Sequence, residues 1–69
     1  MSGKEGEPVS RRERTVLRLL AAGRSNPEIA AELVVSLSTV KTQVSSLYRK
    51  LNVHTRQAAI ATARSWNLL

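Results

Sequence analysis

The sequence predicts an all-α domain of four short helices, with a helix-turn-helix motif at its centre. Apolar residues recur at the three- and four-residue spacing of a helix, and no segment alternates apolar and polar residues as a strand does. Each periodic segment also follows a serine, asparagine or threonine that can cap a helix. At 69 residues the chain forms one small domain, and folding buries only about 60% of the surface of such a chain.

The first helix is expected at about residues 11–22. Ser10 and Glu13 have the spacing of a capping box, in which each side chain accepts a hydrogen bond from the other residue's amide. Gly23 can adopt the left-handed conformation that ends the helix. Glu13 is also a candidate partner for Arg56, which we expect either to anchor the fold or to contact a phosphate. The apolar residues that repeat along this segment are Val16, Leu17, Leu20 and Ala21.

The second helix is expected at about residues 27–34. Pro27 suits the first turn of a helix, where its missing amide costs nothing. Asn26 is therefore the predicted cap, with Ser25 as the competing choice. The β-branched pair Val34-Val35 breaks the helix. Its narrow apolar face consists of Ile29, Ala30 and Leu33.

The third helix, at about residues 37–51, has the clearest pattern. Ser36 is its predicted cap, and Asn52 can take the left-handed conformation at its end. The apolar side chains lie within about 60° of one another at 100° per residue. They are Val40, Val44, Leu47 and Leu51. The opposite face carries hydroxyl and basic side chains without an acid, namely Ser38, Thr42, Ser45 and Arg49, with Lys41 and Ser46 at its edges.

The fourth helix is expected at about residues 56–66, capped by Thr55 and rich in alanine. Trp66 at its end is expected in the core or at the edge of a dimer. Residues 9–69 then make up the folded domain. Residues 1–8 are glycine-rich and charged, and they read as a disordered tail or linker.

Positive charge is concentrated in the second half of the chain. The sequence carries 11 Lys and Arg against 5 Asp and Glu, a net charge of +6. Residues 33–69 hold five basic residues and no acid, whereas residues 1–32 hold six basic and five acidic residues. This uncompensated positive surface favours a polyanionic partner, although charge alone also fits a merely soluble basic domain.

The composition excludes several classes of protein. The chain has no cysteine, and His54 is its one histidine, so the common zinc spacings cannot form. We therefore expect a protein that is not an enzyme and that has no metal and no cofactor. No stretch approaches the roughly 18 apolar residues of a membrane span, and no signal segment begins the chain. These features favour a soluble, cytoplasmic protein that does not bind a membrane.

The outer face of the third helix indicates a nucleic-acid contact. A solvent-exposed helical face usually mixes Glu with Lys, but this one carries only hydroxyls and positive charge. Short hydroxyl side chains let the helix approach a surface closely, and Lys and Arg neutralise phosphates. The major groove admits one helix, and a short helix, a brief turn and a longer basic helix form a helix-turn-helix. The alternative is the outward face of a small bundle.

Residues spread along the chain match one family in type and spacing. They are Val9-Ser-Arg-Arg-Glu13, Val16-Leu17, Gly23, Asn26, Ile29-Ala30, Leu33, Ser36, Thr39-Val40-Lys41, Tyr48-Arg49-Lys50-Leu51, Val53 and Thr55-Arg56. On these residues the chain resembles the LuxR/FixJ-type (GerE-like) helix-turn-helix domain of bacterial transcription regulators, such as the output domains of response regulators. The resemblance implies sequence-specific binding of double-stranded DNA, with the third helix in the major groove.

The resemblance also implies which residues contact DNA. The base-facing positions are Lys41, Thr42 and Ser45. The positions expected to contact the DNA backbone are Asn26, Ser38, Thr39, Arg49, Lys50 and His54. Two residues depart from the usual pattern, because many members have His at the position of Gln43 and a longer basic residue at that of Ser45. Gln43 can donate and accept hydrogen bonds but cannot carry a charge, and the shorter Ser45 reaches fewer base edges.

The resemblance implies that the fourth helix mediates a homodimer. Because the patch on this helix is small, the dimer is expected to be weak. The residues that face away from its apolar side are Gln57, Ala61 and Arg64. A two-fold pair would place two third helices about one duplex turn apart, which predicts a palindromic or inverted-repeat operator. RNA polymerase is a further candidate partner, and the bacterial nucleoid is the expected location. The short chain fits either a free-standing protein or an excised C-terminal domain. Its C-terminal end resembles the ends of large multidomain regulators, which favours a fragment.

Two alternative functions remain open at this point. The C-terminal region of a sigma factor is also a basic helix-turn-helix, although the spacing of Thr39-Val40-Lys41 and Lys50-Leu51 argues against it. A protein-interaction module, in which the fourth helix and its exposed alanines bind a partner, is the other. Binding that persists at high salt would favour the interaction module.

Overall fold

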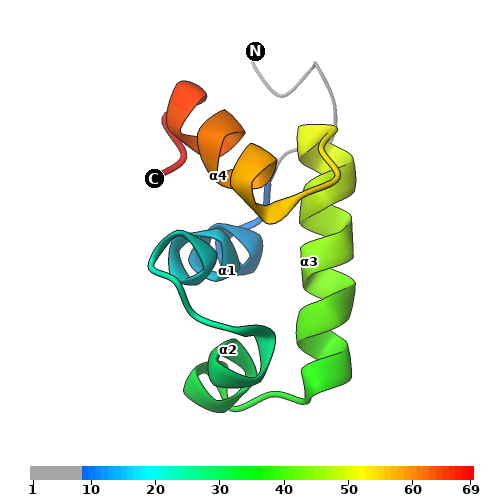
Figure 1. Ribbon diagram of the computed structural model, residues 1–69. Helices are drawn as coiled ribbons and strands as arrows, with labels where there is room; N and C mark the ends of the chain where they lie inside the picture. Colours follow the sequence, from blue (N-terminus) through cyan, green and yellow to red (C-terminus); the bar gives the residue numbers. More distant parts are fainter. Residues whose placement is uncertain (1–8) are drawn as a thin grey trace.

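The computed structural model describes residues 9–69 and shows four helices in that range. They are α1 (Arg11–Ala21), α2 (Asn26–Leu33), α3 (Leu37–Leu51) and α4 (Arg56–Ser65). The longest helix, α3, forms one side of the molecule, and α2, α1 and α4 lie against it in that order along its length (Figure 1). The all-α class is confirmed, and each predicted helix agrees with the structure to within one residue at either end. The tail expected at residues 1–8 lies outside the described residues.

Serine and threonine caps begin the four helices. The Ser10 hydroxyl accepts from the amide of Glu13 at 3.1 Å, and the Glu13 carboxylate accepts from the Ser10 amide at 3.0 Å. This capping box is the predicted one. Ser36 and Thr55 cap α3 and α4 as predicted.

The predicted cap of α2 is wrong. Asn26 is the first helical residue, and Ser25 is the cap, with its hydroxyl 3.3 Å from the amide of Glu28. The residue three positions after the cap decides between Ser25 and Asn26. Glu28 returns a carboxylate to the Ser25 amide at 2.8 Å, whereas the corresponding residue for an Asn26 cap would be the apolar Ile29.

The turn between α2 and α3 depends on a left-handed valine. Val34 ends α2 with φ 57° and ψ 50°, and its side chain is 88% exposed. The amide of Val35 donates to the carbonyl of Ala30 at 3.0 Å, which closes the end of the helix. A β-branched residue rarely adopts this conformation, so the backbone is strained at this point.

The core lies where the four helices meet. Its buried apolar residues are Val16, Leu17, Leu20, Ile29, Ala30, Val40, Leu47, Leu51, Ala59 and Ala63. Val44 is half-buried at the edge of this cluster, and Trp66 is 52% exposed, so the tryptophan is not part of the core. Within residues 9–69, no helix combines the length and apolar character needed to cross a bilayer.

Arg56 joins the start of α4 to the end of α1. Its Nη2 donates to the carbonyl of Leu20 at 2.8 Å and to that of Arg24 at 2.7 Å. The expected anchoring role of Arg56 is therefore confirmed. The candidate pairing of Arg56 with Glu13 does not form. Arg56 binds the carbonyl groups of Leu20 and Arg24, whereas Glu13 lies in the first turn of α1.

Candidate nucleic-acid interface

The exposed face of α3 has no acidic residue, as its sequence LSTVKTQVSSLYRKL shows. Val40, Leu47 and Leu51 are buried on one side of the helix and fix its rotation about its axis. This rotation exposes the side chains expected to contact base edges, which are Lys41, Thr42 and Ser45. The helix therefore presents hydroxyl groups and a lysine to solvent, with its apolar side turned into the core.

An open groove connects the first half of α3 with the start of α2. It has a volume of about 520 Å³, and Asn26, Pro27, Leu37, Lys41 and Tyr48 are among the residues that line it. The two helices thus bring half-buried Asn26 and exposed Lys41 to the same groove, although they are fifteen positions apart.

A second hollow lies at the C-terminal end of α3. Its volume is about 420 Å³, and Ser45, Arg49 and His54 are among its lining residues. It brings exposed Arg49 of α3 together with His54 of the loop that leads to α4. The expected backbone contacts therefore fall at both ends of α3, with the expected base contacts between them.

The hydroxyl groups at the start of α3 bind one another. The Ser36 and Thr39 hydroxyl oxygens are 2.9 Å apart, and the Ser38 hydroxyl oxygen lies 3.4 Å from that of Ser36. Ser36 also accepts from the amide of Thr39 at 3.1 Å. Ser38 and Thr39, both exposed, are thus positioned by the cap of the helix.

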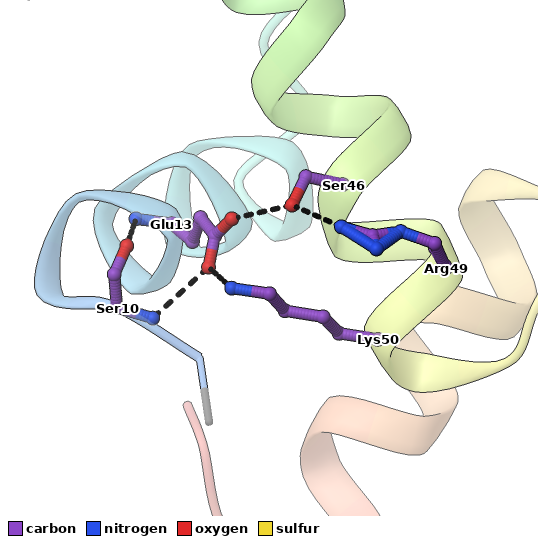
Figure 2. Close-up of polar contacts among 5 residues, drawn as sticks. All are labelled: Ser10, Glu13, Ser46, Arg49 and Lys50. Atoms are coloured by element: carbon purple, nitrogen blue, oxygen red, sulfur yellow. Dashed lines mark hydrogen bonds and ion pairs between the residues drawn. The ribbon is translucent and has the colours of Figure 1, made fainter. Parts of the chain in front are cut away.

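The Glu13 carboxylate fixes the other end of α3 to α1 (Figure 2). Lys50 Nζ lies 2.7 Å from Glu13 Oε1, and the Ser46 hydroxyl donates to Oε2 at 2.8 Å. Burial by itself would raise the pKa of Glu13, but the hydrogen bonds from Lys50, the Ser10 amide and Ser46 outweigh it and lower that pKa to about 2. The carboxylate is therefore ionised and bonded on both oxygens.

This contact changes the expected role of Lys50. Its side chain is only 14% exposed, and its ammonium group is bound to Glu13. Lys50 thus ties α3 to α1, whereas the neighbouring Arg49 is exposed. Arg49 Nη2 lies 3.4 Å from the Ser46 hydroxyl, which connects it to the same network (Figure 2).

Sequence reasoning missed Ser46. The sequence pattern puts Ser46 at the edge of the exposed face, yet it is half-buried and binds Glu13. The signal that could have identified it is its spacing from Lys50. Residues four apart lie on the same side of a helix, so a buried acid that met one of them would meet both.

The sequence of this folded chain matches a known family. Residues 7–63 match the family described as bacterial regulatory proteins, luxR family. This match covers most of the 69 residues. The chain belongs to the LuxR family.

Named relatives of this LuxR-family domain are much longer proteins. It is 56% identical over 61 residues to a protein of Mycobacterium tuberculosis named as probable transcriptional regulatory protein NarL, covering 88% of this chain and 28% of the relative. It is 47% identical over 58 residues to the HTH-type transcriptional regulator MalT of Vibrio campbellii, covering 84% of this chain and 6% of that one.

A solved structure has the same fold. The crystal structure of the response regulator ChrA, from a heme-sensing two-component system, superposes with a TM-score of 0.90 at 41% identity. The superposition covers 99% of this chain and 34% of ChrA. The LuxR-family domain thus corresponds to one part of a larger regulator in each of these comparisons.

Two of the remaining features bear on what this LuxR-family domain can do. Gln43 Oε1 is buried without a hydrogen-bond partner among the described residues, so its carbonyl group faces the inside of the domain. Within residues 9–69, no three His, Asp or Glu side chains gather as they would around a metal ion. The exposed surface of α3 displays positive charge and hydrogen-bonding groups.

Proposed function

We propose that this LuxR-family domain binds double-stranded DNA sequence-specifically, with α3 in the major groove. One observation carries the proposal. The exposed face of α3 lacks an acid and consists of short hydroxyl side chains with a basic residue near each end. Such a face can approach base edges closely, and its positive charge is favoured beside phosphates.

Lys41, Thr42 and Ser45 are the proposed base contacts. All three are exposed on α3, and Lys41 also lines the groove shared with α2. A lysine can donate to the O6 and N7 acceptors of guanine, and a threonine can contact the methyl group of thymine. The sequence preference of the domain is expected to depend on these residues.

The proposed backbone contacts lie at both ends of α3. They are Asn26, Ser38, Thr39, Arg49, Lys50 and His54. Arg49 is the strongest basic candidate, because it is exposed beside His54. Lys50 is the weakest, because Glu13 already binds its ammonium group.

The fourth helix supports a proposed dimer. Gln57, Ala61 and Arg64 are exposed on α4, which leaves this face accessible to a second copy of the chain. Two copies related by a two-fold axis would read a palindromic or inverted-repeat operator. We propose that such a dimer acts in the cytoplasm on the nucleoid, with RNA polymerase as a further partner.

Matched variants in α3 test the proposal. Bound duplexes would first be selected from a random pool, and their affinities then measured as a function of salt. Lys41→Ala is expected to cost about 1–3 kcal/mol at the selected site and to relax its sequence preference. Arg49→Ala is expected to weaken binding to all DNA sequences alike. It should also lower the slope of log affinity against log salt concentration by about one unit.

Two results would contradict the proposal. Equal losses on selected and random DNA for Lys41→Ala would remove this residue from base recognition. An absence of duplex binding at low salt, together with a protein partner retained at high salt, would favour the interaction module instead. The sigma-factor alternative has no support, because the chain matches the LuxR family.

A further inference from the structure

α1 carries a second basic surface that the proposed DNA contact does not use. Arg11, Arg14 and Arg18 are exposed and follow the spacing i, i+3, i+7, so they lie within about 60° of one another and span about 10 Å along the helix. We call these three residues the arginine stripe. Across residues 9–69, no acidic side chain forms an ion pair with any of them.

The arginine stripe borders a hollow that also contains an apolar group. The hollow has a volume of about 510 Å³ and is lined by Val9, Thr15 and the three arginines. Val9 is half-buried and packs against the core, so it is held in place. Guanidinium groups bind carboxylates in a bidentate geometry, and the valine offers an apolar contact beside them.

The arginine stripe faces away from α3. Glu13 lies about 130° around α1 from the centre of the stripe, and Glu13 contacts Ser46 and Lys50 of α3. The arginine stripe therefore lies on a side of α1 that does not meet α3. A duplex on the outer face of α3 would therefore leave the stripe accessible.

We propose that the arginine stripe docks an acidic segment of another protein, in which Asp or Glu residues alternate with apolar ones. Charge complementarity selects an anionic partner. The apolar wall at Val9 favours a polypeptide over nucleic acid, because a polypeptide supplies carboxylates and apolar side chains together, whereas a nucleic-acid backbone supplies mainly phosphates. The domain would then hold DNA on one side and a protein partner on the other.

The test uses a short synthetic peptide of alternating glutamate and leucine, titrated into the isotope-labelled 69-residue chain. Backbone amide shifts are expected at the arginine stripe and Thr15, with or without a bound duplex. Polyglutamate should bind the same residues more weakly, because it lacks the apolar groups. Arg14→Gln with Arg18→Gln should weaken peptide binding about tenfold or more.

A charge-matched variant separates this inference from DNA binding. Lys41→Gln with Arg49→Gln also removes two positive charges, and it should impair duplex binding while leaving peptide affinity within about twofold. The inference fails if both double variants weaken peptide binding equally, if the peptide shifts the amides of α3 instead, or if the peptide causes no amide shifts. It also fails if a non-specific duplex shifts the stripe amides and displaces the peptide, which would indicate a second DNA surface.

Discussion

The two halves of α3 are held in the domain in different ways. The C-terminal half is bound to α1 through Glu13, whose carboxylate receives hydrogen bonds on both oxygens. The N-terminal half lies beside α2 (Figure 1) and follows the left-handed Val34. It also contains Gln43, whose carbonyl has no hydrogen-bond partner within residues 9–69. The polar contact with α1 thus lies at the C-terminal end of the helix, and the strained Val34 precedes its N-terminal end.

The residues of α3 that stabilise the domain through Glu13 differ from those proposed to contact DNA bases. The side chains that bind Glu13 are Ser46 and Lys50, whereas those proposed to contact bases precede them in α3. Lys41 and Thr42 are exposed, so the domain does not need them for its core. Substitutions of these two residues are therefore expected to leave the fold intact.

The largest expected effect is the loss of the Glu13 contact. Glu13→Ala would leave the Lys50 ammonium group without its carboxylate, in a site where the two side chains are only 10% and 14% exposed. Breaking such a pair costs about 3–5 kcal/mol, and Ser10 would also lose its reciprocal cap. Urea denaturation followed by circular dichroism measures this loss, with Glu13→Gln as the milder variant if the alanine variant does not fold.

An exposed ion pair supplies the matched control. Arg24 pairs with Glu32, and both side chains are 45% exposed. Glu32→Ala should cost about 1 kcal/mol or less, because water screens the pair. If the Glu13 and Glu32 variants lost equal stability, the special role of the α1–α3 contact would be refuted.

The pH dependence of stability tests the same contact, because acid protonates the Glu13 carboxylate. The pKa of Glu13 falls from 4.5 to about 2 in the folded protein. Because the folded pKa is depressed, its contribution is complete above pH 4.5 and is lost as the pH falls towards 2. The loss amounts to about 3 kcal/mol by linkage. Denaturation midpoints at several pH values should show a shallower acid slope for Glu13→Gln than for the wild type, and identical slopes would contradict this assignment.

The helices could be predicted from the sequence, whereas the contacts between them could not. Helix bounds depend on caps and periodicity, and both are local, as with Ser10 and Glu13 in α1. The partner of Glu13 depends on how α1 packs on α3, and this packing selected Lys50 in place of Arg56. For the same reason, the exposure of Lys41 followed from the periodicity of α3, but its groove shared with Asn26 did not.

Replacement of Gln43 is expected to raise the stability of the domain, by less than the loss expected for Glu13→Ala. A buried acceptor without a donor costs about 1–3 kcal/mol, so Gln43→Met, which keeps the length of the side chain, should stabilise the domain by about 1 kcal/mol. The same exchange at exposed Gln57 is the control, and in the monomeric chain it should change stability by about 0.5 kcal/mol or less. A loss of stability in Gln43→Met would mean that the amide makes contacts that stabilise the N-terminal half of α3.

The smallest expected effect concerns the strain at Val34. Asparagine tolerates the left-handed conformation better than a β-branched residue, and the valine is 88% exposed, so Val34→Asn gives up little apolar burial. We expect a gain of about 0.5–1 kcal/mol in the free energy of unfolding, measured by urea denaturation. Val35→Asn is the matched control and should destabilise the domain, because Val35 packs against the core. If Val34→Asn gave no gain, the N-terminal end of α3 would not be strained, and the contrast between its two halves would rest on Gln43 alone.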